Sequence, residues 1–524
     1  MDQPARRGEG LERCVHKLLI TTRPSLSSPA LRGFYTPRSN VLLYTAGSGM
    51  DTAKELLRRY WGYSTFRPLQ QEIISSVLAG HDTLAILATG SGKSLCYQLP
   101  ALCLGGVTLV VSPLIALMKD QVDALNRRGI HAAAWTSTLD SRGRSQLGEG
   151  LKNGTIRILF VSPERCVQPA FLACLKDCPL RLIAVDEAHC ISAWGHNFRP
   201  EYRQLASLRT TFADVPVIAL TATATPDVRK DIARQLGLVR PKEFVGSFDR
   251  QNLTYQVRKR TDPDLFLRTY LANRRKETGI VYCRSRQETE DLARSLKKRG
   301  FTVAAYHAGL SQQVRESVQD AFLKGGLQAV CATIAFGMGI DKPDVRFVVH
   351  TSLPRSPEAY YQETGRAGRD GKPGECVLLY SPSDAARLRA LASRDGYTAG
   401  TLRVALAKID AMRDYCEASG CRRRALLRYF GEAYPADTCG ACDACAGVAG
   451  MDAEDALFLR LKTVRKTLAE KRGVLPYMIF ADKSLREMAK AKPEDRAGFA
   501  AISGVGPFKL AKYGPAFLEA IRAG

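Results

Sequence analysis

A glycine-rich run that ends in Lys93 and Ser94 is the first candidate chemical site. It follows a predicted strand, opens a predicted helix and reads Ala88-Thr89-Gly90-Ser91-Gly92-Lys93-Ser94. Glycines let backbone N–H groups face phosphate oxygens, and the start of a helix adds a favourable potential. Lys93 would reach the β- and γ-phosphates of a nucleotide, and Ser94 would bind Mg²⁺. Leu87 stands where the usual pattern has its first glycine, so a glycine-rich turn with a surface lysine is the alternative.

Two adjacent carboxylates, Asp186 and Glu187, form the second candidate site. They follow the apolar run Leu182–Val185, which predicts a buried strand. In open α/β sheets, ligands bind at the carboxyl ends of the strands. A metal ion there would hold the charge of Asp186, and Glu187 would orient or deprotonate an attacking water. A solvated acidic turn would not explain this position, and the two motifs together predict an enzyme that hydrolyses a nucleoside triphosphate.

Arg366 and Arg369 form a third candidate site, within the run Gln362–Asp370. Arginine that is supplied across a cleft can stabilise charge on a transferring γ-phosphoryl group. A basic surface loop is the alternative. Paired with the Lys93 loop, these arginines predict a two-domain motor whose cleft closes on the nucleotide and reopens after hydrolysis.

A cluster of cysteines is the fourth candidate site. Two residues separate Cys439 from Cys442 and Cys442 from Cys445, and Cys421 and Cys416 precede them. Four thiolates are enough for a tetrahedral, structural zinc site. An iron–sulfur cluster is the alternative, and disulfides are not expected in a reducing compartment.

Alternating strand-like and helical segments must position these residues. From Asp51 onward, apolar runs alternate with amphipathic stretches, which predicts βαβ units and parallel sheets. The predicted strands are Thr83–Leu87, Thr108–Val111, Ile158–Val161, Leu182–Val185, Val217–Leu220, Gly279–Cys283, Thr302–Tyr306, Ala329–Ala332, Phe347–His350 and Cys376–Tyr380. We therefore expect an α/β fold with two tandem parallel-sheet domains that join near Val245–Thr261.

The chain beyond Ser383 loses its strand signals and becomes helical and basic, then cysteine-rich. The expected parts are an N-terminal extension (1–49), a first α/β domain (50–245), a second α/β domain (246–385), a helical metal-binding module (386–447), a Gly/Ala linker (446–450) and a small all-helical domain (451–524).

The charge of the chain points to a polyanionic partner. Its 524 residues contain 76 Lys+Arg and 52 Asp+Glu, a net charge of +24, which favours nucleic acid or an anionic membrane. The 24 residues from Leu95 to Met118 carry no formal charge and are long enough to span a bilayer. Two prolines and a Gly-Gly pair interrupt them, so we expect a short helix, a turn and the buried strand Val107–Val111. No secretory hydrophobic region opens the chain, so export is not expected.

These motifs, in this order, resemble the RecQ family of superfamily 2 DNA helicases over residues 56 to about 445. The similar stretches are Trp61–Gln70, the Lys93 loop, Ser112–Met118, Asp186–Tyr202, Leu220–Ala224, Ala335–Lys342, the Arg366/Arg369 loop, Cys421–Arg423 and Tyr429–Glu432. The resemblance implies two RecA-like domains, a zinc module with Cys421 as the fourth ligand, and translocation from 3′ to 5′ on single-stranded DNA. It also implies that Tyr63, Arg67 and Gln70 recognise adenine, which gives a preference for ATP.

The run Cys190–Pro200 matches the aromatic-rich loop of that family. Trp194 and Phe198 offer faces for stacking bases, and Arg199 offers charge, directly beside the acidic pair. The resemblance adds His196 to this set. A loop placed there could report DNA occupancy to the nucleotide site. Ordinary aromatic packing is the alternative interpretation.

Residues 454–524 resemble an HRDC domain, but the family usually has a winged-helix domain before it. Here only Ala446 to Ala453 separates the zinc module from the HRDC-like part. Gly504-Val505-Gly506, with Lys509 and Lys512 beyond, suggests a close approach to a DNA phosphate, or simply a helical hairpin.

The expected function is an ATP-dependent 3′–5′ DNA helicase in repair and recombination, with ATP, Mg²⁺ and Zn²⁺ as cofactors. An RNA helicase is disfavoured by the zinc module and the HRDC-like part. A DNA-stimulated translocase with little unwinding is the alternative that the short zinc–HRDC spacing leaves open. Expected partners are single-stranded and tailed or forked duplex DNA, a single-stranded DNA-binding protein and other repair proteins, in the cytoplasm at the nucleoid and without a membrane.

Residues 1–49 carry seven basic and three acidic residues and no sustained period. They read as a disordered tail, as sequence upstream of a true start at Met50, or as a transit peptide.

A chain that begins at Met50 should unwind DNA as well as the full chain does at moderate salt. The removed segment has a net charge of +4, so any added DNA affinity should appear at low salt and vanish as salt rises, because it rests on counterion release. Unwinding and DNA binding by the two proteins at two salt concentrations measure this. A large loss of unwinding at moderate salt would contradict it.

Overall fold

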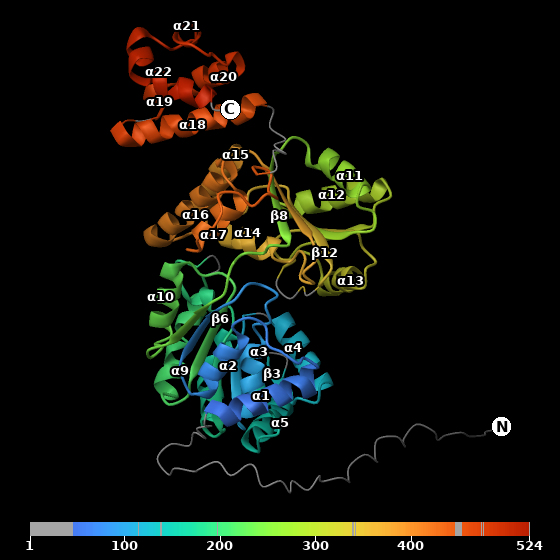
Figure 1. Ribbon diagram of the computed structural model, residues 1–524. Coiled ribbons are helices and arrows are strands. Elements are labelled where there is room, and N and C mark those ends of the chain that lie inside the picture. The colour runs from blue at the N-terminus through green and yellow to red at the C-terminus, as the bar shows by residue number, and fades with distance from the viewer. Residues whose placement is uncertain are drawn as a thin grey trace, which may run out of the picture. The chain divides into compact units, whose positions relative to one another are not determined.

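The computed structural model describes residues 46–522 except 114, 137–138, 196–197, 338–339, 341, 446–452, 473 and 475 (Figure 1).

The first helix begins earlier than the sequence suggests. Helix α1 (Ala46–Trp61) contains Met50, which packs with buried Ala53 and Leu57 against the first domain. Helix α1 thus begins four residues before Met50, the predicted start of the first domain. The rest of the N-terminal segment, His196 and the 446–450 linker lie outside the described residues.

Seven strands of the described chain form the first parallel sheet, in the order β3-β4-β2-β5-β6-β1-β7. They are β1 (Thr83–Ile86), β2 (Val107–Val111), β3 (Ala132–Trp135), β4 (Ile158–Val161), β5 (Leu180–Val185), β6 (Val217–Thr221) and β7 (Lys242–Val245). The inner strands β1, β2, β4 and β6 are buried throughout and β5 is buried at all but one position, as a sheet covered on both faces requires. The two edge strands are not among the predicted strands, because β3 is largely alanine and β7 is mostly exposed.

Helices cover both faces of this sheet, and alternate strand residues enter two separate cores. Leu84 and Ile86 of β1 join one apolar cluster, whereas Ala85 joins the other. The helical elements are α2 (Gln70–Leu78), α3 (Leu95–Cys103), α4 (Ile115–Arg127), α5 (Ser141–Lys152), α6 (Pro163–Cys166), α7 (Pro169–Lys176), the 3₁₀ turn η1 (Ala188–Ile191), α8 (Pro200–Arg203), α9 (Ala206–Thr211) and α10 (Pro226–Gln235). The uncharged segment thus forms α3 and β2, as predicted. Within the described residues, no helix combines the length and apolarity needed to cross a membrane.

The second parallel sheet has six strands within the described chain, in the order β10-β11-β9-β12-β13-β8. They are β8 (Leu253–Lys259), β9 (Thr278–Tyr282), β10 (Val303–Tyr306), β11 (Ala329–Ala332), β12 (Val345–His350) and β13 (Gly374–Tyr380). Strand β8 pairs with β13 over its whole length. The predicted join at Val245–Thr261 is therefore too long, and the link between the sheets is residues 246–252. An edge strand with a mixed burial pattern gave no strong sequence signal.

Helices pack around the second sheet and continue into the cysteine module. The sheet helices are α11 (Pro263–Ala272), α12 (Arg286–Lys298), α13 (Gln312–Leu323), α14 (Pro357–Thr364) and α15 (Ser383–Ala392), and the module contains α16 (Ala399–Glu417) and α17 (Arg422–Tyr429). A buried ion pair stabilises the module: Arg422 Nε lies 3.0 Å from Asp443 Oδ1, and its Nη1 donates to the Tyr415 carbonyl at 2.8 Å. The carbonyl contacts satisfy a guanidinium that burial would otherwise destabilise.

The last part of the chain has a core of its own. It consists of α18 (Ala453–Arg472), α19 (Pro476–Ile479), α20 (Asp482–Ala491), α21 (Arg496–Ala500) and α22 (Pro507–Arg522). The Phe480 ring meets the rings of Phe499, Tyr513 and Phe517 edge-on at centroid distances of 5.0–6.1 Å. Gly504, in the turn between α21 and α22, has a φ of 88°. The predicted fold class, two parallel-sheet domains followed by helical modules, is confirmed.

Candidate nucleotide site and metal centre

The candidate phosphate loop joins β1 to α3. Gly90 and Gly92 have φ values of 85° and 83°, the left-handed region that glycine adopts most easily. The Lys93 Nζ donates to the carbonyls of Leu87 at 3.2 Å and Ala88 at 3.5 Å. The ammonium group therefore folds back over the loop that would hold a phosphate.

The three candidate adenine-binding residues precede this loop in the sequence, and two of them contact it. The Gln70 Nε2 donates to the carbonyls of Ser91 at 3.2 Å and Gly92 at 3.1 Å. The Arg67 guanidinium donates to the Gly90 carbonyl. Tyr63 is 54% exposed, so its ring has room for a stacked partner. Arg67 and Gln70 thus reach the loop through its backbone.

The acidic pair follows β5 and interacts electrostatically with Lys93. Burial, and then the adjacent Glu187, raise the pKa of Asp186 to about 7, whereas Lys93 opposes the shift. Burial lowers the pKa of Lys93, against the pull of both carboxylates. A nearby cation stabilises the charged form of a buried carboxylate whose pKa is raised. Carboxylate and hydroxyl oxygens are ligands that Mg²⁺ prefers. Asp186 and Ser94, the residue before α3, fit this role.

A buried histidine links the acidic pair to the neighbouring strand. His189 Nδ1 lies 3.3 Å from Glu187 Oε2 and 2.8 Å from Thr221 Oγ1, at the end of β6. Glu187 has a φ of 47°, an uncommon conformation for a residue with a side chain. The sequence analysis did not single out His189 or Thr221, although His189 stands two residues after Glu187.

The loop with Arg366 and Arg369 follows α14 and lies against the phosphate loop. A Cβ atom added at Gly90 would lie 3.6 Å from Arg369 Cγ, and one added at Gly365 would lie 3.5 Å from Thr89 Cβ. Arg366 is buried, and its Nε has no hydrogen-bond partner among the described residues. The structure therefore brings charged groups of both domains together.

The aromatic loop connects to the same region through its backbone. A Cβ atom at Gly195 would lie 2.3 Å from the His189 carbonyl oxygen, so the loop is in direct contact with the residue that faces Glu187. Trp194 is 47% exposed. Phe198 is less accessible, because the Arg203 guanidinium lies 4.8 Å from its ring centroid. The Arg199 Nη1 donates to the Pro113 carbonyl at 3.4 Å.

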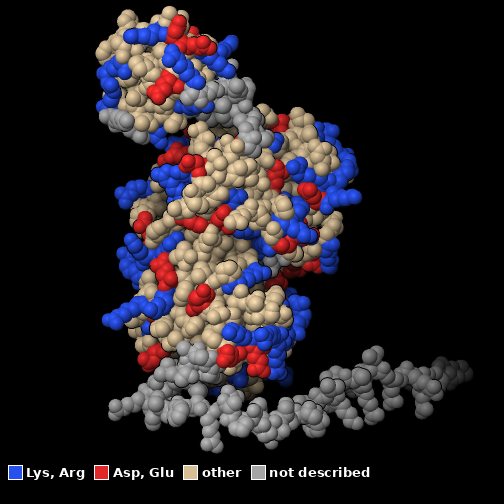
Figure 2. All heavy atoms as spheres, in the orientation of Figure 1, with Lys and Arg blue, Asp and Glu red and all other residues tan. Residues whose placement is uncertain are grey.

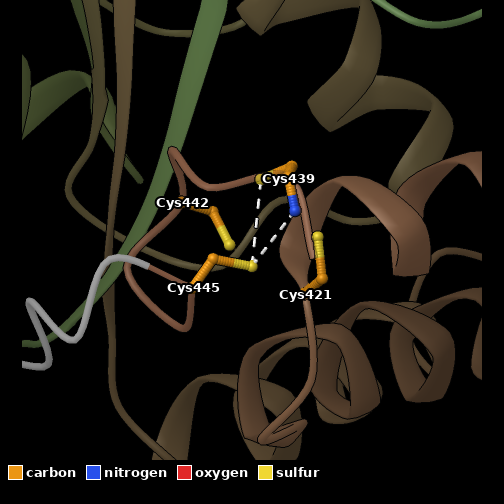
Figure 3. Close-up of side chains that lie close together, drawn as sticks. All are labelled: Cys421, Cys439, Cys442 and Cys445. Carbon is orange, nitrogen blue, oxygen red and sulfur yellow. Dashed lines mark hydrogen bonds between the residues drawn. The ribbon is translucent and has the colours of Figure 1, made fainter. Parts of the chain in front are cut away.

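Four cysteine side chains point toward one another beside α17 (Figure 3). The sulfur atoms of Cys421, Cys439, Cys442 and Cys445 all lie within 4.8 Å of one another. A tetrahedral zinc ion with Zn–S bonds of about 2.3 Å needs sulfur atoms about 3.8 Å apart, so the set fits zinc with little adjustment. Cys416, the fifth candidate, lies outside this group in the apolar core.

Backbone N–H groups support the thiolates. The Arg422 N–H donates to Cys442 Sγ and the Cys439 N–H donates to Cys445 Sγ, each at 3.4 Å. Burial acts against the thiolate of Cys439, but N–H groups of Ala441 and Cys442 bring its pKa down to about 6.

Two parallel-sheet domains, with a candidate phosphate loop on one and an arginine loop of the other beside it, are typical of helicase-type nucleotide motors. Comparison with known proteins supports this class. Family models match in the order DEAD/DEAH box helicase (67–232), helicase conserved C-terminal domain (263–371), RecQ zinc-binding (382–446) and HRDC domain (454–521).

Relatives narrow the class to one family. The ATP-dependent DNA helicase RecQ of Bacillus subtilis is 36% identical over 586 aligned residues, covering 90% of this chain and 99% of the relative. The ATP-dependent DNA helicase RecQ of Pasteurella multocida is 48% identical over 394 residues, 75% of this chain and 62% of the relative. The chain belongs to the RecQ family, as the motifs indicated, although it matches less than two thirds of the length of the Pasteurella protein.

Solved structures share the fold at lower identity. The Mycobacterium smegmatis helicase Lhr, bound to ssDNA and AMP-PNP, has a TM-score of 0.50 at 22% identity, covering 69% of this chain and 57% of that one. The DEAD-box helicase Mss116, bound to ssRNA and UDP-BeF, has a TM-score of 0.55 at 15% identity, covering 92% and 97%. These likenesses support the two-domain fold.

Replacing Cys442 by Ser should reduce bound zinc from one per chain to well below one and give poorly soluble protein. Structural zinc contributes directly to folding, and Cys442 is a buried member of the set. Elemental analysis and a thermal melt of the purified variant measure this, with Cys174→Ser, a half-buried cysteine outside the set, as the control. Iron with sulfide in the unaltered protein would refute the zinc assignment.

Proposed function

We propose that this chain is an ATP-dependent DNA helicase that moves from 3′ to 5′ on single-stranded DNA and separates duplex strands in repair and recombination. The observation that carries the proposal is the contact of the Arg366/Arg369 loop with the phosphate loop, in a chain of the RecQ family. Such a site is complete only when the two domains meet, so hydrolysis can drive their relative motion.

Each residue of the proposed nucleotide site has a role in binding or hydrolysis of ATP. Lys93 binds the β- and γ-phosphates, and Asp186 and Ser94 are the residues that would hold Mg²⁺. The metal supplies charge neutralisation on the phosphate oxygens. Glu187 orients the attacking water and takes its proton as the new oxygen–phosphorus bond forms and ADP leaves. Arg366 and Arg369 stabilise the charge on the transferring group, and Tyr63, Arg67 and Gln70 hold adenine.

The aromatic loop is the element that couples DNA to this chemistry. Trp194 stacks on a base, and the same sequence run supplies Phe198, Arg199 and His196. A movement of the loop on DNA would displace His189, which Gly195 contacts, and so change the position of Glu187. Lysine and arginine side chains outnumber acidic ones across the visible face of the molecule, which suits a polyanionic strand (Figure 2).

The proposal also covers the role of the metal, the DNA substrates, the protein partners and the place of action. Zinc at the four cysteines is structural because protein ligands fill all four positions. Single-stranded and tailed or forked DNA are the substrates, a single-stranded DNA-binding protein and other repair proteins are partners, and the enzyme acts in the cytoplasm at the nucleoid.

The short spacing between the zinc-binding range and the HRDC range favours a second candidate function. Only residues 447–453 separate the matched zinc-binding and HRDC ranges, so a DNA-stimulated translocase with little unwinding is the rival. Duplexes with a 3′ or a 5′ single-stranded tail distinguish the two. ATP-dependent separation of the 3′-tailed duplex supports the helicase, ATP turnover without separation supports the rival, and no DNA-stimulated turnover contradicts both.

Lys93→Ala should lower ATP hydrolysis by at least about 100-fold, because a cation that stabilises developing charge is lost. Binding of single-stranded DNA should stay nearly unchanged, since its contacts lie elsewhere. A coupled ATPase assay and fluorescence anisotropy measure the two. The control is Lys152→Ala, which removes an exposed lysine that pairs with Asp177 on the surface. Wild-type turnover in Lys93→Ala would overturn the phosphate-loop assignment.

Trp194→Ala should keep basal ATP hydrolysis and lose most of its stimulation by single-stranded DNA, since the stacking face is gone. Base–aromatic stacking is worth about 1–3 kcal/mol, so stimulation should need a roughly 5- to 160-fold higher DNA concentration. Trp194→Phe, which keeps an aromatic face, should retain most of the stimulation. Unchanged stimulation in the alanine variant would show that the loop only packs.

A further inference from the structure

The short link between the two sheets, residues 246–252, contains an arginine that reaches both sides of the nucleotide site. The Arg250 Nη1 donates to the Thr89 carbonyl of the phosphate loop at 3.3 Å and to the Gly365 carbonyl at 3.1 Å. Its Nη2 donates to the carbonyls of Ala367 at 2.9 Å and Gly368 at 3.0 Å. One guanidinium therefore contacts a carbonyl on domain 1 and three carbonyls of the Arg366/Arg369 loop.

These three carbonyls flank Arg366, so Arg250 fixes the backbone from which that side chain extends. A planar guanidinium can serve several carbonyls in fixed directions, which the single ammonium group of lysine cannot do. Asn252 also holds the backbone of this loop, because its Nδ2 donates to the carbonyls of Gly368 at 2.9 Å and Lys372 at 2.8 Å. Among the hydrogen bonds of Arg250 to described residues, the one to the Thr89 carbonyl crosses to the phosphate loop.

The zinc module holds the backbone on the far side of Arg250. The buried guanidinium of Arg423 donates to the Asp249 carboxylate, to the Arg250 carbonyl at 2.8 Å and to the Leu253 carbonyl at 2.6 Å. Arg423 stands two residues after Cys421. The link is therefore attached to the chain segment that carries Cys421, one of the four residues that would hold zinc.

A second contact of the module holds the start of the link. The Glu432 carboxylate accepts hydrogen bonds from Ser247 Oγ and the Phe248 N–H, both at 2.6 Å. The rings of Phe248 and Phe430 stack with centroids 4.6 Å apart and an interplanar angle of 8°. The Phe430 carbonyl in turn accepts from Arg229 Nη2, on α10 of domain 1, at 3.1 Å. The module thus holds the link before and after Arg250.

We propose that Arg250 is a positioning residue for ATP hydrolysis, which sets the Arg366/Arg369 loop against the phosphate loop and is itself held in place by the zinc module. The proposal rests on the proposed ATPase function. It assigns the module a role at the nucleotide site, through Arg423 and Glu432, in addition to its own folding. The three bonds to the arginine loop keep Arg250 with domain 2, and the bond to Thr89 forms when that loop meets the phosphate loop.

Arg250→Met, which keeps the length of the side chain and removes its donors, tests the proposal. In the full chain with saturating single-stranded DNA, kcat for ATP should fall at least about 10-fold while KM changes little, because a small misplacement of reacting groups costs rate rather than ground-state binding. Affinity for ADP with aluminium fluoride, a mimic of the transferring phosphoryl group, should fall with kcat, and affinity for ADP alone should not. Arg250→Lys should recover only part of kcat.

The control is Arg258→Met, which removes a half-buried arginine of β8 that contacts Gln256 and lies near the Phe266 ring. It should leave kcat within about twofold of the unaltered protein, since it touches neither loop. Glu432→Ala, which leaves the four cysteines intact, should retain one zinc per chain and lower kcat in the same way as Arg250→Met, to a smaller extent.

Four outcomes would overturn the proposal, three of them with a folded Arg250→Met protein. Those three are an Arg250→Met protein with unchanged kcat, a loss of affinity for ADP equal to the loss for its aluminium fluoride complex, and a fall in kcat that Arg258→Met reproduces. Failure of Arg250→Met to fold, with full kcat in the folded Arg250→Lys protein, would also overturn it. If the unaltered protein shows no DNA-stimulated ATPase, the proposed function fails instead, so the two failures are distinguishable.

Discussion

In the proposed function, cations from two separate sheets meet the negative charge of a triphosphate, and the roles given to the rest of the structure depend on this requirement. Lys93 lies in the loop between β1 and α3 of the first domain, and Arg366 and Arg369 follow α14 of the second. In this proposal, groups of both domains meet the γ-phosphate. A split site of this kind makes hydrolysis conditional on domain contact, which is how chemical energy becomes relative motion.

The short link and the zinc module make that contact reproducible. Residues 246–252 would allow many relative positions of the sheets if they were free, but Glu432 and Arg423 bind them on both sides of Arg250. Buried guanidinium groups are costly unless every donor has an acceptor, and backbone carbonyls are acceptors whose position the fold fixes. The module that looks remote in the sequence is therefore part of the frame around the nucleotide site.

The sequence was sufficient for the fold class, the inner strands and the charged motifs, because fully buried strands and glycine-rich loops have strong local patterns. It failed at β3, β7 and β8, whose edge positions leave mixed or alanine-rich patterns. It placed the Lys93 loop between a strand and a helix and Asp186 at the end of a strand, but it gave no sign of Arg250, whose partners are backbone carbonyls more than 100 residues away along the chain. Contacts to carbonyls depend on tertiary position and leave no pattern of residue types.

Translocation along single-stranded DNA tests the central claim, that closure of one shared site moves the chain, most directly. Oligonucleotides of increasing length with a fluorophore at the 5′ or the 3′ end report arrival after rapid mixing with ATP. We expect arrival at the 5′ end, after a delay that increases in proportion to length, and none at the 3′ end. ATP hydrolysis with a delay that does not depend on length would contradict the account.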